Sequence, residues 1–154
     1  MAEQNQSAAM IPLEKVIILS KVALFSMLKT EIIQTISKMT REKNYSDGEL
    51  LFSQNKTGDS LFIIVSGKVV IFRTTENGEE KHIATLKENE FIGELSLFDA
   101  KTHTASARCL EQSKFLVIGR DDIEGLVYQH PKIALGFLKA LISRMRGMII
   151  RQTQ

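Results

Sequence analysis

The residues best suited to chemistry lie in one stretch, residues 91–98 (FIGELSLF), followed after a short loop by residues 103–106 (HTAS). Gly93 permits a close approach of the backbone, and a short helical turn after it would present N–H groups that have no partner within the turn. The loop that follows returns polar side chains to the same place. This pattern is typical of a site that captures an anion, and a phosphate would fit there.

Glu94 stands at the start of the predicted turn, where its carboxylate is suited to accept hydrogen bonds from a sugar hydroxyl beside that phosphate. A phosphate joined to a sugar indicates a nucleotide. A glutamate early in a helix also complements the helix dipole without binding anything, so the short motif leaves both interpretations open.

The elements that must position these residues fall into three blocks. Apolar residues recur at helical spacing over residues 12–39, which predicts two helices. Short apolar runs separated by turn residues over residues 45–118 predict antiparallel strands. Residues 121–150 predict further helices, because Asp121 with Glu124 is typical of an acidic capping box and Pro131 suits the first turn of a helix.

Turn signals divide the strand block at short intervals. They are the dipeptides Asp47-Gly48, Gly58-Asp59, Ser66-Gly67 and Asn77-Gly78, each with a residue able to adopt positive φ. The order of helices, strands and helices has no βαβ alternation and no internal repeat, which predicts the α+β class. We expect one domain over residues 11–154 and a disordered tail over residues 1–10.

The chain resembles the cyclic-nucleotide-binding domain family, which includes the catabolite activator protein, the regulatory subunit of protein kinase A and cyclic-nucleotide-gated channels. Residues 91–106 resemble its phosphate-binding cassette, and the segments DGELLF (47–52), GDSLFII (58–64) and SGKV (66–69) match its early strands in order and spacing. The resemblance covers about residues 24–149. It implies an antiparallel β-roll, a double-stranded β-helix of jelly-roll type, flanked by N-terminal helices and a long C-terminal helix.

The resemblance also implies a ligand site for cAMP or cGMP, without a metal, in a stand-alone domain. Main-chain N–H groups of Gly93, Leu95 and Ser96 would hold the cyclic phosphate and Glu94 the ribose 2′-hydroxyl, while Thr104, followed by Ala105, would lie at the phosphate or the base. Asn55 stands where the family often has glycine. Asparagine also tolerates left-handed geometry, so we expect the turn to survive.

His103 is a departure from the family, which places an arginine at this position. Arginine carries a permanent charge and a fork of donors, whereas imidazole donates from one nitrogen at a time and is mostly neutral at pH 7. Losing a charge-assisted hydrogen bond costs about 1.5–3 kcal/mol, or roughly ten- to a hundredfold in affinity. We therefore expect weakened binding that declines as the pH rises from about 6 to 8. Lys101 is a second source of charge on this loop.

Composition narrows the function classes. A net charge of +2 on 154 residues is too balanced for a dedicated nucleic-acid binder. The single cysteine, Cys109, is predicted to be a small buried residue and favours a cytoplasmic protein. No apolar run approaches the ~20 residues that span a bilayer, so no membrane insertion is expected. His82, His103 and His130 lack metal-site spacing and no nucleophile–base pair is visible, so we expect neither a metal site nor an enzyme.

The final helix, predicted over about residues 132–150, carries more apolar surface than packing on one side requires. The resemblance implies that it lies over the ligand or pairs two subunits, while the alternative is that it only caps the β-roll. Its bases, which no acid accompanies, are interpreted as a complement to the helix dipole. Because the sequence ends at Gln154 without a helix-turn-helix, we expect no direct DNA contact.

The predicted function is therefore a regulatory sensor of a cyclic mononucleotide, which signals through its C-terminal helix to a second copy or to an effector protein. The alternative is a degenerate member of the fold that binds no nucleotide and acts as a protein-interaction scaffold.

Overall fold

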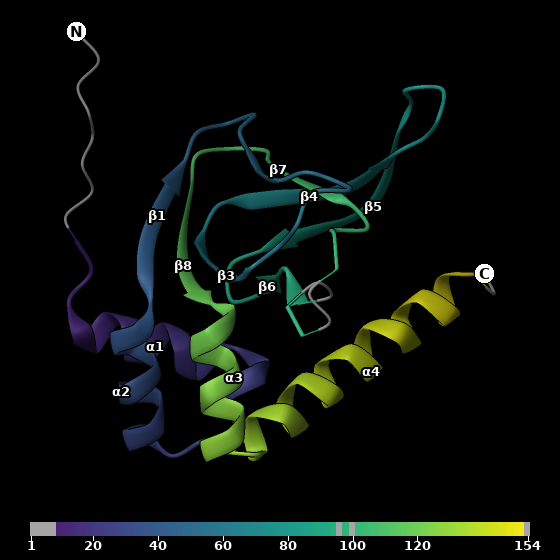
Figure 1. Ribbon diagram of the computed structural model, residues 1–154. Coiled ribbons are helices and arrows are strands. Elements are labelled where there is room, and N and C mark those ends of the chain that lie inside the picture. Colours follow the sequence, from purple (N-terminus) through teal and green to yellow (C-terminus); the bar gives the residue numbers. More distant parts are fainter. Residues whose placement is uncertain (1–8, 95–96, 99–100, 153–154) are drawn as a thin grey trace, which may run out of the picture.

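The computed structural model of the chain describes residues 9–94, 97–98 and 101–152. N-terminal helices precede a β-roll, and two helices follow it (Figure 1). The helices are α1 (Pro12–Lys21), the 3-10 helix η1 (Ala23–Phe25), α2 (Thr30–Met39), α3 (Arg120–Gln129) and α4 (Lys132–Gln152). The strands are β1 (Arg41–Tyr45), β2 (Leu50–Phe52), β3 (Ser60–Ser66), β4 (Lys68–Thr74), β5 (Glu80–Lys87), β6 (Phe91–Ile92), β7 (Ser106–Cys109) and β8 (Ser113–Gly119).

The strands form two antiparallel four-stranded sheets, with the orders β1-β8-β3-β6 and β2-β7-β4-β5. Many neighbours in a sheet are distant in the sequence, as where Phe62 of β3 lies opposite Val117 of β8. This topology is that of the expected jelly-roll, and it confirms the predicted α+β class and β-roll.

Strands β3 and β8 are buried on both faces, which explains their uninterrupted apolar runs. On β3, Leu61 and Ile63 pack against the helices, whereas Phe62 and Ile64 point to the other face and pack between the sheets. The roll therefore has two cores. Cys109 belongs to the core between the sheets, where burial raises the pKa of its thiol, as expected for a small buried residue.

The turns follow the predicted signals in most places. Gly48, Gly67 and Gly78 adopt φ of 86°, 105° and 82°. The remaining signal, Gly58-Asp59, contains no left-handed residue, but Asn55, three residues earlier, adopts a φ of 68°. Asparagine therefore does replace the family's glycine in this turn, as expected.

The start of the β-roll and the cap of the helix after it differ from the prediction. The β-roll begins before residue 45, because β1 is an exposed edge strand that needs no apolar run. The capping box at Asp121 is not formed: Gly119 is the N-cap of α3, and Asp121 lies within the first turn. Residues 1–8 of the predicted tail lie outside the described residues. Met10 packs against the helical core, and its N–H donates to the Glu42 carboxylate.

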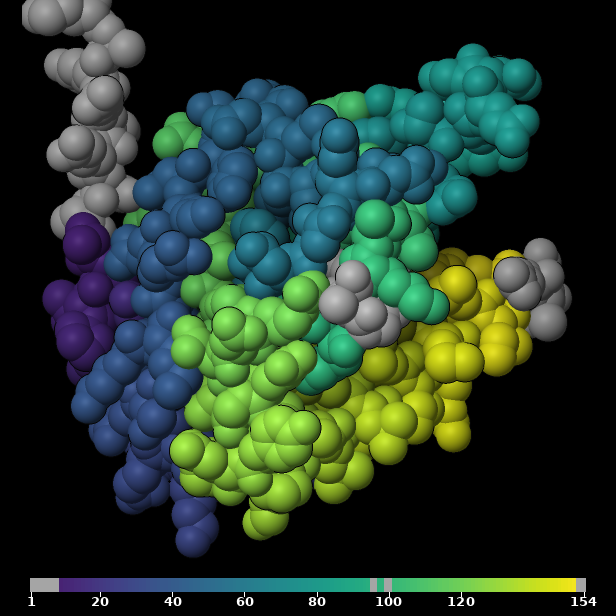
Figure 2. Space-filling model, viewed as in Figure 1, coloured from purple at the N-terminus to yellow at the C-terminus, as the bar shows by residue number. Residues whose placement is uncertain are grey.

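Helix α4 is anchored at its N-terminal end by a close contact with η1. A Cβ on Gly136 would lie only 2.3 Å from the Leu24 carbonyl oxygen, so only glycine permits this approach. Beyond the anchor, α4 runs out alongside the β-roll and away from the other helices (Figure 1). The molecule is hollowed between the hairpin of β4 and β5, coloured teal, and the yellow C-terminal half of α4 (Figure 2).

Among the described residues, no helix is both long and apolar enough to cross a lipid bilayer.

Candidate functional site

Gly93 follows β6 in a conformation that other residues avoid. Its φ is 99°, and a Cβ there would lie 2.6 Å from the main-chain oxygen of Ser60, so both backbone strain and crowding require glycine. The N–H of Leu97 donates to the carbonyl of Glu94 at 3.2 Å, which closes one tight turn. This hydrogen bond joins the described residues on the two sides of the segment in which the turn is predicted. Leu95 and Ser96, the other predicted amide donors, lie outside the described residues.

The far side of this turn is held by two helices. Arg120, the first residue of α3, donates from Nε to the carbonyl of Leu97 at 2.7 Å. The ring of Phe98 meets the ring of Phe137, from α4, edge to face with 5.1 Å between the centroids. The turn that carries Glu94 is therefore fastened to α3 and α4 as well as to the sheet.

His103 is fixed to the roll by backbone and ring contacts. Its N–H donates to the carbonyl of Lys56, and its carbonyl accepts from the N–H of Asn55, both at 2.9 Å. The imidazole stacks on Phe52 with 3.8 Å between the centroids. Burial lowers the pKa of His103, and the nearby charge of Asp59 only partly offsets this effect. His103 therefore favours its neutral form.

One cavity of about 550 Å³ brings the predicted site residues together. Gly93, Glu94, His103, Thr104 and Ala105 all line it. Its other walls come from the sheet and from α4, including Phe52, Ile71, His82, Ala84, Leu86, Arg144, Gly147, Met148 and Arg151. This volume lies within the ~300–1,000 Å³ typical of small-molecule sites, and the lining combines an apolar wall with a few polar groups.

Glu94 does not face the cavity as an unpaired carboxylate. Arg144 of α4 donates from Nη1 to Glu94 Oε1 and from Nη2 to the carbonyl of Phe91, the latter at 2.7 Å. The guanidinium carbon also lies 4.1 Å from the centroid of the Phe91 ring. The side chain of Glu94 is only 9% exposed, so its charge needs this partner.

Arg144 is not among the site residues predicted from the sequence, where the bases of this helix are interpreted as a complement to the dipole. That interpretation was wrong for Arg144, because the dipole acts within the last turn and this residue lies about two turns before the end of α4. A signal was available: Ile133, Phe137 and Arg144 share one face of the helix at i, i+4 and i+11. An arginine on a buried face needs an acidic partner.

His82 was also missed. The three histidines are far apart in the sequence, but the structure brings His82 and His103 to the same cavity, whereas His130 lies elsewhere. Over the described ranges no three His, Cys, Asp or Glu side chains gather as metal ligands would.

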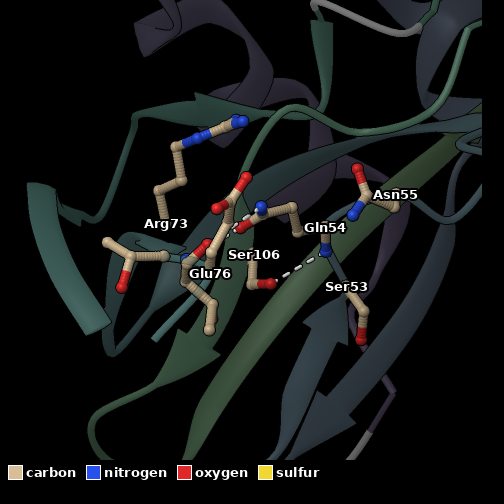
Figure 3. Close-up of a pocket in the computed structure, with 8 residues that line it drawn as sticks. Ser53, Gln54, Asn55, Arg73, Glu76 and Ser106 are labelled. Atoms are coloured by element: carbon tan, nitrogen blue, oxygen red, sulfur yellow. Dashed lines mark hydrogen bonds between the residues drawn. The ribbon is translucent and has the colours of Figure 1, made fainter. Parts of the chain in front are cut away.

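A second cavity, of about 680 Å³, is lined by Ser106 and by residues of the 53–55 and 73–76 segments (Figure 3). Its polar groups bind one another: Gln54 pairs with the backbone of Thr74 in both directions, and the Gln54 N–H donates to Ser106 Oγ at 2.8 Å. Arg73 donates to the carbonyl of Thr104. Although this cavity is larger, the contacts of Gln54 and Arg73 hold the 103–106 loop in place, and the predicted residues Gly93, Glu94 and His103 do not line it.

A model of the cyclic nucleotide-binding domain family matches residues 42–130. The chain belongs to this family. The CRP-like cAMP-activated global transcriptional regulator of Mycobacterium tuberculosis is 29% identical over 84% of this chain and 58% of its own length. The cyclic AMP receptor protein of Thermus thermophilus is 32% identical over 80% of this chain and 57% of its own length. The chain therefore spans less than three fifths of these relatives.

Solved structures agree with this membership. The catabolite activator protein of Thermus thermophilus matches with a TM-score of 0.77 and 30% identity, over 85% of this chain and 62% of that chain. The N-terminal domain of a transcriptional regulator from Streptomyces coelicolor matches with a TM-score of 0.70 and 32% identity, over 85% of this chain and 94% of that chain. The domain is thus a cyclic nucleotide-binding regulatory domain of the type found in CRP-like proteins.

Proposed function

We propose that this domain senses a cyclic mononucleotide, cAMP or cGMP, in the cavity between the β-roll and α4. The observation that carries the proposal is a single cavity shared by Gly93, Glu94 and the 103–105 loop with an apolar sheet wall. A cyclic nucleotide is divided in the same way, with a charged phosphate and a polar sugar at one end and a flat base at the other. Two relatives support this ligand class, the CRP-like cAMP-activated regulator of Mycobacterium tuberculosis and the cyclic AMP receptor protein of Thermus thermophilus.

In the proposed complex the phosphate lies against the turn after Gly93. The left-handed conformation of Gly93 brings the main chain close to the cavity, where the N–H groups of Gly93, Leu95 and Ser96 would hold the phosphate oxygens. Glu94 would accept a hydrogen bond from the ribose 2′-hydroxyl. Thr104 and Ala105 would border the phosphate or the base, which would extend along the apolar wall.

The proposed output is a movement or stiffening of α4. This helix contacts the segment after Gly93 at two residues: Arg144 binds Glu94, and Phe137 packs on Phe98. A ligand that alters the Arg144–Glu94 ion pair would therefore weaken or strengthen a contact that fixes the position of α4. No contact of this kind needs a catalytic step, so we propose a cytoplasmic regulator and not an enzyme.

The face of α4 that points away from the roll supports a second copy of the chain as the partner. Five apolar side chains lie there, each 41–61% exposed: Leu135, Leu138, Ile142, Met145 and Ile149. They recur at alternating intervals of three and four residues, which is the spacing of a two-helix seam. The inward face, with Ile133, Phe137 and Arg144, lies opposite, so one helix can serve the cavity and the seam together.

Ligand-dependent thermal unfolding tests the sensor. Cyclic AMP or cyclic GMP at a hundred times its dissociation constant should add about 2.7 kcal/mol to the free energy of unfolding. Linear 5′-AMP is the matched control, and we expect a smaller effect because it lacks the cyclic diester. No stabilisation by either cyclic nucleotide at millimolar concentration would contradict the proposal.

That negative result would favour the scaffold alternative, which has an observation of its own. The neutral, buried His103 ring is already packed on Phe52, and the Glu94 carboxylate is already paired, so the site is satisfied without a ligand. An interaction scaffold would keep these contacts and the apolar face of α4 while binding no nucleotide.

The dimer is tested by light scattering coupled to size exclusion. Ile142→Asp places a charge in the middle of the seam and should convert a dimer to a monomer. Ser143→Asp, one residue away and off the seam, is the control and should leave the dimer intact. A wild-type chain that is monomeric with and without cyclic nucleotide would contradict the second-copy assignment.

A further inference from the structure

A cyclic phosphate diester carries one negative charge, and the position at which the family places an arginine here holds His103. The imidazole is only 7% exposed, its ring stacks on Phe52, and burial favours its neutral form. If the ligand is bound as proposed above, its charge needs a cation from elsewhere on the cavity wall.

We propose that Arg144 of α4 supplies the cation for the ligand phosphate, in place of the family's arginine at position 103. This inference rests on the proposed function and assigns the charged contact to a different element of the fold. The phosphate site is then made by two elements, the turn at Gly93 and the C-terminal helix.

The position of the guanidinium carries the assignment. It contacts the carbonyl of Phe91 and the carboxylate of Glu94, which lie on either side of Ile92 and Gly93. The same arginine lines the cavity together with Gly93. The charge therefore lies beside the main chain at Gly93, one of the residues whose N–H would hold the phosphate.

The guanidinium also has donors to spare. Of the five N–H groups that an arginine carries, the contacts with described residues use one on Nη1 and one on Nη2. The position of the guanidinium over the Phe91 ring restricts the movement of the group and so of its remaining donors. Because the side chain is 34% exposed, these donors can be reached from the cavity.

Glu94 gives a second reason for a cation at this point. A nearly buried carboxylate without a partner would repel a phosphate placed beside it. Arg144 cancels that charge, so the carboxylate can accept the ribose hydroxyl without opposing the phosphate. With Arg144 present, the ribose can bind Glu94 while the phosphate binds next to it.

The test compares single substitutions by titration calorimetry with cyclic AMP and cyclic GMP. Arg144→Gln should weaken binding roughly ten- to a hundredfold, as expected for a lost charge-assisted hydrogen bond. Arg144→Lys keeps the charge without the fork and should lose less. His103→Gln should change the affinity less than about threefold, since a neutral ring is replaced by a neutral amide. Arg146→Gln, on the exposed side of the same helix, is the charge-matched control and should have no effect.

A double substitution separates contact with the phosphate from neutralisation of Glu94. If Arg144 binds the phosphate, Glu94→Gln combined with Arg144→Gln stays at least as weak as Arg144→Gln alone. Recovery of affinity in the double variant overturns the assignment, as does an Arg144→Gln variant that binds as tightly as wild type or more tightly. A wild-type protein that binds neither nucleotide instead overturns the proposed function, and the two failures are therefore distinct.

Discussion

Two arginine–glutamate pairs in this molecule use the same chemistry in different surroundings. Arg108 of β7 makes two hydrogen bonds with Glu80 of β5, and its guanidinium carbon lies 4.4 Å from the centroid of the Phe72 ring. Arg144 pairs with Glu94 and lies over Phe91 at 4.1 Å. Each arginine thus has one carboxylate and one aromatic ring.

The difference lies in burial and in what each pair joins. Glu80 is 48% exposed, and its pair with Arg108 joins strands of one sheet. Water competes with this pair, so removing one partner leaves the other charge hydrated. Glu94 is 9% exposed, and its pair joins a helix to the wall of the cavity. A pair across one sheet holds strands together, whereas a pair between a helix and the cavity wall lies where a bound ligand would contact it.

The largest expected contrast is in nucleotide affinity. Glu94→Gln removes the charged acceptor for the ribose hydroxyl and should weaken binding of cyclic AMP or cyclic GMP about ten- to a hundredfold. Glu80→Gln, made in the exposed pair, should leave the affinity unchanged. Calorimetric titration of both variants measures the difference, and equal losses would remove the functional distinction between the pairs.

A smaller contrast is expected in stability without ligand. Arg144→Gln leaves the Glu94 carboxylate nearly buried without its cation, which should lower the free energy of unfolding by about 1–2 kcal/mol. Arg108→Gln should lower it less, because water replaces the lost contact. Urea unfolding of the two variants gives this comparison, and a larger loss for Arg108→Gln would contradict it.

The smallest contrast is in the pH dependence of stability. The hydrogen bond from Arg108 lowers the pKa of Glu80, so its contribution is present above the unfolded pKa near 4.3 and is lost as the pH falls further. Burial lowers the pKa of His103, so the folded state takes up its proton less readily. The His103 contribution is therefore full above about pH 6.5 and declines below it.

The contribution of His103 to stability therefore changes over a higher pH range than the contribution of the exposed Arg108–Glu80 pair. The free energy of unfolding, measured at several pH values between 7 and 5, should depend less on pH in His103→Gln than in the wild type. In Glu80→Gln its pH dependence over this range should be unchanged. Phe52, which stacks on the ring, and Asp59, whose charge acts on it, are intact in both variants. A wild-type stability that rises as the pH falls through this window would be the wrong sign.

Much of the fold could be predicted because the apolar runs and turn residues of the sequence coincide with the buried strands and tight turns of the structure. The apolar runs of β3 and β8 come from burial on both faces, and the left-handed turns at Gly48, Gly67 and Gly78 come from glycine's lack of a Cβ. Strand β1 was not predicted because an edge strand can be mostly polar and then has no apolar run to indicate it.

The residues of the candidate site that lie close together in the sequence were the ones predicted, while the helical spacing of Arg144 indicates an inward face without naming its partner. Gly93, Glu94, His103, Thr104 and Ala105 belong to two nearby segments, and all of them line the cavity. Arg144 and His82 come from α4 and β5, and no local pattern indicates which strand or turn they will face.

The sequence by itself determined the order of helices, strands and helices, the need for glycine at position 93 and the absence of arginine at position 103, because each depends on residue type and near neighbours, while the β-roll was implied by the family resemblance. Only the tertiary structure decided that His103 is packed on Phe52 and that Glu94 is paired with Arg144. The physical reason is that burial and charge pairing depend on surfaces brought together by long-range packing. The position of α4 is decided by the approach of Gly136 to Leu24, more than a hundred residues apart in the chain.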